Sequence, residues 1–267
     1  MHQINQPGRH ADSVPPRFLE HDGSFPCFLC ATAEALNEVI AGRPSPVVSG
    51  PAIAEELFEQ RETVARDDRR AATLWTRLER RAGNEAIRTL LEAFCSDLPG
   101  ANEAVATAIA RIWVEGACVL NDLGSPEILA VEKAAVRTRA EAHLMTGLVR
   151  FSGLSDDSWY SSIQPDCDIL VLIADHFASR FPGMNWIIHD RGRHTAIIHR
   201  PEAGWKVVEG FALEGKLAWS DDESRLRETW SRYFRSVAIG ERTNPRLQVS
   251  HMPKKYWGDL PETRLKG

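Results

Sequence analysis

Apolar side chains recur at helical spacing through the first half of the chain. The clearest run lies between Ser24, which suits a helix N-cap, and Gly42, which ends the run. A second helix start is predicted at 125–127. There serine can act as the N-cap, proline as the first helical residue, and glutamate as an acid that complements the positive end of the helix. Further runs between these two predict a helical half over 18–146, preceded by a polar, flexible arm at 1–17.

The pattern changes after Gly147, where short strand-like runs replace the long helical ones. Five runs predict strands, and they are LVRFSGL, WYSSIQP, NWIIHD, TAIIHR and WKVVEGF. The third and fourth are joined through Arg-Gly-Arg at 191–193, a spacing typical of a hairpin. Asp168 and Ser220 each precede an apolar helical run, and we expect each to cap its helix.

These elements predict an α+β protein with a single domain over 18–267. Its helical N-terminal half covers 18–146, and 147–267 combines a small antiparallel sheet with helices. Neither GxGxxG nor GxxxxGK[ST] occurs, and GxSxG is missing as well. The usual sequence signals of a nucleotide-binding loop and of a hydrolase nucleophile are therefore lacking.

Composition argues against a disordered, membrane-spanning or secreted protein. Hydrophobic residues make up 43% and charged residues 26%, which excludes a largely disordered chain. No run of about 18 apolar residues occurs, and the first residues lack the apolar core of a secretory signal. We therefore expect a cytoplasmic protein that does not bind a membrane.

The five cysteines are irregularly spaced, and only Cys27 and Cys30 form a CxxC pair. No second pair and no HxxxH follows, and no CxxxCxxC triplet is present. The ligand sets of a structural zinc site and of a radical-SAM iron–sulfur cluster are therefore incomplete. We expect reduced, buried cysteines, with a redox or metal role of the pair as the alternative. We assign no metal and no cofactor.

The C-terminal part of the chain is strongly basic. Residues 225–257 hold eight basic and two acidic residues, a balance of +6, which leaves −11 for the rest of a chain whose net charge is −5. Such asymmetry is typical of a nucleic-acid face on an acidic protein, and aromatic rings beside cations can stack on bases. The competing interpretation is a solvated helix face followed by a tail that packs on the core. The candidate nucleic-acid-binding residues are Arg242, Asn244, Arg246, Gln248, Lys254, Lys255, Tyr256 and Trp257.

A second set of residues suits acid–base chemistry. His143 ends a predicted helix, Arg150 follows on the next strand, and Asp166 precedes the next helix. A histidine and an arginine beside a pocket can bind phosphate or transfer a proton, and a carboxylate can bind Mg²⁺ or act as an acid or base. The competing interpretation is structural, with a histidine at the negative helix end, an arginine paired with an acid, and an aspartate that caps a helix. These three residues are the candidate catalytic group.

Several motifs carry a resemblance to a known family. They are DGSF (22–25), HLMTGLVRF (143–151), IQPDCDIL (163–170), HFASRF (176–181), NWIIHDRGR (185–193) and ERTNPRLQVSHMPKKYWGDLPE (241–262). Together they resemble an uncharacterised bacterial family assigned to DNA metabolism or DNA repair, whose members are typically paired with a radical-SAM protein. In some members a similar domain is fused ahead of a uracil-DNA-glycosylase-like domain. The chain departs from the family pattern at Leu144, where a second basic residue is common, and at Asp168, where asparagine is common.

The resemblance implies a DNA-related role beside a radical-SAM partner, and it implies no particular reaction. We therefore expect a DNA repair or modification protein that binds nucleic acid or positions its partner, while any radical chemistry belongs to the partner. One alternative is a nucleobase- or nucleotide-processing enzyme that uses His143, Arg150 and Asp166 with water as nucleophile. Another alternative is a protein-interaction module without affinity for nucleic acid.

Overall fold

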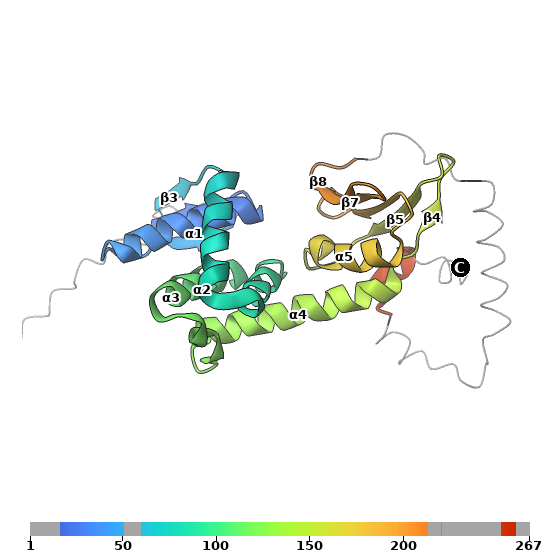
Figure 1. Cartoon of the computed structure of the whole chain (residues 1–267). Helices are drawn as coiled ribbons and strands as arrows, with labels where there is room; N and C mark the ends of the chain where they lie inside the picture. The colour runs from blue at the N-terminus through green and yellow to red at the C-terminus, as the bar shows by residue number, and fades with distance from the viewer. Residues whose placement is uncertain (1–16, 51–59, 213–219, 221–251, 260–267) are drawn as a thin grey trace, which may run out of the picture. The chain divides into compact units, whose positions relative to one another are not determined.

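The computed structural model describes residues 17–50, 60–212, 220 and 252–259 of the 267-residue chain (Figure 1). The chain divides into two compact units. Unit 1 comprises Met1–Phe94 and Leu98–Ala135, and unit 2 comprises Cys95–Asp97 and Val136–Gly267. A single domain over 18–267 stays a prediction, and all of the predicted arm except Arg17 lies outside the described residues.

Unit 1 packs helices against a small parallel sheet (Figure 1). Its helices are α1 (Phe25–Ile40), α2 (Asp68–Phe94), α3 (Ala101–Glu115), the 3-10 helix η1 (Ala117–Asn121) and the first part of α4 (Pro126–Leu148). Its strands are β1 (Arg17–Glu20), β2 (Val47–Ser49) and β3 (Gln60–Thr63). The strand order is β2-β1-β3, and both outer strands run parallel to β1.

Local sequence explains where the helices of unit 1 begin and bend. The Ser24 hydroxyl accepts a hydrogen bond from the Cys27 N–H at the start of α1, so the predicted N-cap is confirmed. Helix α2 is interrupted at Gly83, whose φ of 81° lies in the left-handed region that glycine adopts at little cost. The large side chains that fill the core of this unit are Leu19, Phe28, Leu78, Leu90, Ile109, Ile112 and Ile128.

The prediction of a helical N-terminal half over 18–146 is wrong, because unit 1 contains the three-stranded sheet. Strand β1 (RFLE) and strand β2 (VVS) each have two adjacent apolar residues, so neither shows the alternation by which a strand is recognised. Leu19 in β1 and Val48 in β2 are nevertheless almost fully buried. Pairing between segments far apart in the chain, rather than local pattern, therefore creates this sheet.

Unit 2 is built on a five-stranded sheet. Its strands are β4 (Ser152–Gly153), β5 (Trp159–Ile163), β6 (Trp186–Asp190), β7 (Thr195–Arg200) and β8 (Gly204–Val208). They lie in sequence order, and β5 and β6 are parallel while every other neighbouring pair is antiparallel. Helix α5 (Leu170–Arg180) lies between β5 and β6 in the chain, and a short 3-10 helix, η3 (Lys254–Asp259), follows near the C-terminus.

The predicted α+β class, with a small antiparallel sheet and helices in the C-terminal half, is therefore also wrong. The chain is a mixed α/β protein, its second sheet is mixed, and the described part of this half is rich in strands. The cause is α5, because a helix that crosses back along the sheet returns the chain in its original direction and makes β5 and β6 parallel. The helix expected after Ser220 lies outside the described residues.

Two local predictions for this half have opposite outcomes. The hairpin is confirmed, since β6 and β7 pair antiparallel across 191–194 with Asp190 opposite Thr195. The capping role of Asp168 is wrong, because α5 has Ile169 at its N-cap position and no side-chain cap. Asp168 instead donates its backbone N–H to the carbonyl of Cys95 at 2.8 Å.

One face of the five-stranded sheet packs against α5. Ile163, Ile188 and Ile197 come from three adjacent strands and share a core with Ile173 and Phe177 of α5. This packing holds the ends of β5 and β6 and the loop before α5 in place. Polar side chains of unit 2 gather around that loop. None of the described helices is both long enough and apolar enough to cross a membrane.

Candidate functional site

Glu141 is the buried charge around which the polar site of unit 2 is built. It lies in the second part of α4 and is only 6% exposed. Its Oε1 accepts a hydrogen bond from the backbone N–H of Asp166 at 3.0 Å, and its Oε2 accepts one from the N–H of Cys167 at 2.7 Å. A carboxylate removed from water requires such donors. Helix α4 is thereby tied to the loop that precedes α5.

The C-terminal segment supplies two further donors to Glu141. Tyr256, which is 3% exposed, donates its hydroxyl to Oε1, and the Lys255 ammonium lies 3.0 Å from the same oxygen. The Lys255 ammonium also bonds to the carboxylate of Asp166. Two consecutive side chains therefore anchor η3 to the rest of unit 2.

These contacts fix the charge of each partner. Burial acts to raise the pKa of Glu141, but hydrogen bonds from Tyr256, from the backbone of Cys167 and Asp166 and from Lys255 outweigh it and lower the pKa to about 2. Burial and the bond to Glu141 both raise the pKa of Tyr256. Burial acts to lower the pKa of Lys255, but its bonds to Asp166, Tyr256 and Glu141 raise it above its ordinary value. At neutral pH the anchor is an ion pair supported by a protonated tyrosine.

Arg137 forms a second layer of ion pairs beside the anchor. It lies one turn before Glu141 on α4, and its guanidinium holds the Asp97 carboxylate through two bonds of 2.6 and 2.7 Å. The same guanidinium lies 3.1 Å from the Asp166 carboxylate, so Asp166 is shared between Arg137 and Lys255. The bond from Arg137 lowers the pKa of Asp97 to about 2.

The Cys167 thiol is poorly suited to nucleophilic chemistry. It is fully buried and donates to the Asp97 carboxylate at 3.3 Å. Burial raises its pKa to about 11, so the thiolate is scarce at neutral pH. Its place in the site is that of a packed hydrogen-bond donor.

An open polar cavity of about 510 Å³ lies next to the anchor. Its lining residues are Gln164, Pro165, Asp166, Gly192, Arg193 and Lys255. Arg193 bonds to the buried carboxylate of Asp190 at 2.9 Å and to the carbonyls of Pro165 and Asp166, which ties the β6–β7 turn to the loop before α5. The cations of this cavity are therefore already paired with oxygens of the protein.

The three candidate catalytic residues have separate surroundings. His143 is exposed on α4, and no hydrogen bond joins its ring to Asp166 in the part of the chain that is described. The Arg150 guanidinium donates to the carbonyl of Gly147 at 2.7 Å, close to the C-terminal end of α4. Asp166 takes part in the ion pairs with Arg137 and Lys255.

The candidate nucleic-acid-binding residues divide into two sets. Arg242, Asn244, Arg246 and Gln248 lie outside the described residues. The other four lie in η3, where Lys255 and Tyr256 contact Glu141. Lys254 is exposed, and its ammonium lies 6.0 Å from the ring centroid of the half-buried Trp257.

The cysteine pair of α1 is buried, as expected from the sequence. The Cys27 thiol donates to the carbonyl of Val64 at 3.2 Å and the Cys30 thiol to that of Asp67 at 3.3 Å, so both thiols tie α1 to the segment before α2. Across the described ranges, no three His, Cys, Asp or Glu side chains gather as a metal site.

Sequence reasoning missed Glu141 and the pair formed by Tyr160 and His189. Glu141 gave no signal, because it is one of several charged residues in an alanine-rich helical run. The Tyr160 hydroxyl and His189 Nδ1 are 2.9 Å apart on neighbouring strands, and burial lowers the pKa of His189. Only the parallel register of β5 and β6 brings these two residues together.

The chain matches the model of a known family. Residues 99–262, more than half of the chain, match the model of a family described as a domain of unknown function, DUF4130. The match runs from the start of α3 beyond η3 and so includes Glu141 and both residues that anchor η3 to it. No curated protein and no solved structure matches the chain.

Proposed function

Because the chain belongs to the DUF4130 family, whose description names no function, we propose that it is a nucleic-acid-binding protein of DNA repair or modification that acts with a radical-SAM partner. The observation that carries the proposal is the anchoring of η3 on the buried Glu141. This anchor holds the C-terminal end of the basic segment, 225–257, on unit 2. A charged surface that is fixed before binding loses less conformational entropy when it meets a phosphate backbone.

The anchor separates two roles within η3. Lys255 and Tyr256 are the anchoring residues, since their polar atoms are bonded to Glu141 and, for Lys255, also to Asp166. Lys254 and Trp257 are the contact residues. An exposed ammonium beside an indole ring suits a phosphate next to a stacked base.

The contacts of the candidate catalytic residues favour this proposal over the enzyme alternative. Proton transfer requires an acid or base within hydrogen-bond reach of its partner group. The Asp166 carboxylate instead lies between two cations, and Arg150 donates to a helix-end carbonyl. We therefore propose that these side chains stabilise unit 2 and that the reaction belongs to the partner.

Binding of labelled DNA by the purified full chain tests the nucleic-acid part of the proposal. Affinity is expected to fall linearly in a plot of log affinity against log salt, because each phosphate contact releases a condensed counterion. Single-stranded and duplex DNA are measured side by side, since stacking on Trp257 favours unpaired bases. A chain that binds neither form at low salt contradicts the proposal and supports a protein-interaction module.

Co-purification tests whether the chain binds a radical-SAM partner. Affinity-tagged full chain, expressed in its native host, is expected to retain a protein that shows the absorbance of an iron–sulfur cluster. The isolated chain is expected to release no base and to cleave no strand. Turnover of DNA by the isolated chain contradicts the accessory role and supports the enzyme alternative.

A further inference from the structure

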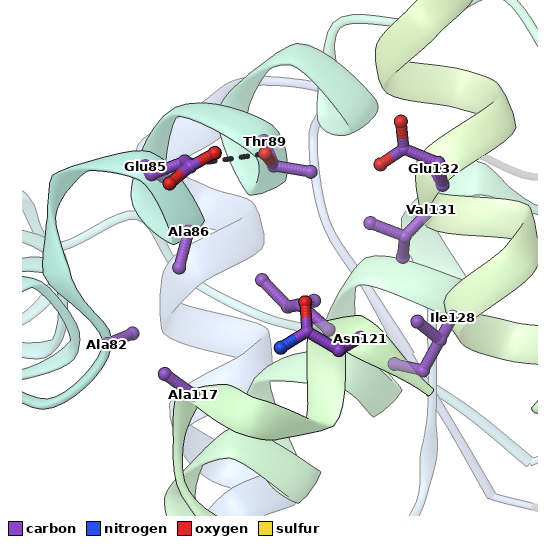
Figure 2. Close-up of a pocket in the computed structure, with 10 residues that line it drawn as sticks. Ala82, Glu85, Ala86, Thr89, Ala117, Asn121, Ile128, Val131 and Glu132 are labelled. Atoms are coloured by element: carbon purple, nitrogen blue, oxygen red, sulfur yellow. Dashed lines mark hydrogen bonds between the residues drawn. The ribbon is translucent and has the colours of Figure 1, made fainter. Parts of the chain in front are cut away.

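Unit 1 contains a small cavity between α2, η1 and α4 (Figure 2). Its volume is about 260 Å³. The residues that line it are Ala82, Glu85, Ala86, Thr89, Ala117, Leu120, Asn121, Ile128, Val131 and Glu132. Pockets for cofactors and drug-sized ligands have volumes of about 300–1,000 Å³. This cavity therefore suits a group of the size of one amino-acid side chain.

The lining of the cavity divides into an apolar wall and a polar rim. Small and branched apolar side chains from all three helices form the wall. Figure 2 shows Glu85 of α2 and Glu132 of α4 on opposite sides of the pocket, with Thr89 of α2 between them and Asn121 of η1 below. The Thr89 hydroxyl donates to the backbone carbonyl of Glu85 at 3.1 Å. The rim therefore offers two carboxylates and one amide oxygen.

The negative charge of the rim is not balanced within the cavity. None of the lining residues is basic, and within the described ranges no ion pair involves Glu85 or Glu132. Elsewhere in the same unit a single arginine, Arg111, contacts the carboxylates of Glu115, Asp122 and Glu127. Arg111 thus bridges one group of carboxylates in unit 1, whereas no guanidinium of the described residues lies between Glu85 and Glu132 in the pocket.

We propose that the pocket of unit 1 receives an arginine side chain from a partner protein. The apolar wall accommodates the methylene stem, and the carboxylates of Glu85 and Glu132 accept the guanidinium from two sides. The Asn121 carbonyl accepts one of the remaining N–H groups. A phosphate group is repelled by the same carboxylates, so the site selects a basic peptide and rejects nucleic acid. This inference does not depend on the proposed function of unit 2.

The test uses two model side chains of nearly the same shape, one positively charged and one neutral. Capped arginine and capped citrulline, its neutral isostere, are titrated into the isotope-labelled full chain while the amide resonances of Ala86, Ala117 and Asn121 are followed. Arginine is expected to shift them in the millimolar range and citrulline to leave them in place. Equal shifts by the two compounds, or no shift at these three residues, overturn the proposal. Tighter binding of capped lysine overturns the choice of arginine, because a guanidinium is the group that bonds to carboxylates through a fork of donors.

Matched variants locate the binding. Glu85→Gln and Glu132→Gln are each expected to weaken binding of capped arginine roughly threefold, and the double variant roughly tenfold, since exposed ion pairs contribute modestly. Glu79→Gln, on an exposed position of α2 outside the pocket, is the control and is expected to bind as the unaltered chain does. Shifts that persist unchanged in the double variant overturn the proposal. If the chemical shifts of the pocket residues change with the concentration of the protein alone, the occupant is a second copy of this chain. That result overturns the proposal of a different partner protein.

Discussion

Glu141 gathers four hydrogen-bond donors, although both of its immediate neighbours in sequence are alanines. Two of the donors are backbone N–H groups of the loop before α5, and two are side chains from η3, more than 110 positions later in the chain. A carboxylate with two acceptor oxygens can satisfy all four donors, whereas an amide cannot. The identity of this one residue therefore controls how three segments of unit 2 meet.

We predict that Glu141→Gln destabilises the protein. The glutamine NH₂ group faces a backbone N–H that loses its acceptor, and Lys255 loses a charged partner. Hydrogen bonds to charged groups contribute about 1.5–3 kcal/mol, and the free energy of unfolding should fall by roughly that amount. Urea unfolding at neutral pH measures the loss. Glu79→Gln is the control, and equal stability of the two variants contradicts the role of Glu141.

The depressed pKa of Glu141 predicts a pH dependence. The carboxyl group has an ordinary pKa of 4.5, which the folded state lowers to about 2. The unfolded chain therefore binds the proton more readily, and the stabilisation from Glu141 is complete above pH 4.5 and is lost as the pH falls toward 2. The stability difference between the unaltered protein and Glu141→Gln should shrink over this interval. A difference that stays constant with pH, measured by urea unfolding, is inconsistent with a charged Glu141.

The helix η3 depends on Tyr256 for its attachment. The Tyr256 ring is buried in the core of unit 2, and its hydroxyl reaches Glu141. Tyr256→Phe keeps the ring but removes this hydrogen bond, so we predict faster amide hydrogen exchange over 252–259 and a loss of about 1 kcal/mol in stability. Tyr160→Phe is the matched control, because it removes a buried hydroxyl bond to His189 instead. Equal rates of amide hydrogen exchange over 252–259 in the two variants contradict the proposed attachment of η3 through the Tyr256 hydroxyl.

Sequence pattern predicted elements better than it predicted their pairing. The hairpin of β6 and β7 follows from two alternating runs and a glycine in the turn, and it is confirmed. The parallel pairing of β5 with β6 depends on the path of α5 over the sheet, which no local pattern records. Strands β1 and β2 show no alternation of apolar and polar residues, because two apolar residues are adjacent in each.

The candidate site shows the same limit. Lys255, Tyr256 and Asp166 were singled out from their chemistry and position, and all three meet at or beside Glu141. Their common partner was missed, because it lies on a helix more than twenty residues before Asp166 and carries no motif of its own. Residue type therefore identified Lys255, Tyr256 and Asp166 as polar groups of the site. Only the fold shows that all three bond to Oε1 of Glu141.

For the whole molecule, the two units differ in the partners that their charges favour. The pocket of unit 1 has two unpaired carboxylates within the described residues, whereas the C-terminal segment assigned to unit 2 has a balance of +6. Opposite charges on separate units allow a basic protein and a nucleic acid to bind the same chain without competing for one surface. We predict that capped arginine leaves the affinity for DNA unchanged. Displacement of DNA by this probe in a competition assay contradicts separate surfaces.

Salt-dependent DNA binding by variants of two exposed lysines tests the proposed nucleic-acid face. Lys254 lies in the anchored helix η3, and Lys133 lies on the part of α4 that belongs to unit 1. Each phosphate contact contributes roughly 0.7–0.9 to the slope of log affinity against log salt. Lys254→Gln is predicted to flatten the slope by about this amount, and Lys133→Gln is predicted to leave it unchanged. A Lys254→Gln variant that is folded and keeps the slope and affinity of the unaltered protein contradicts the nucleic-acid face on the anchored segment.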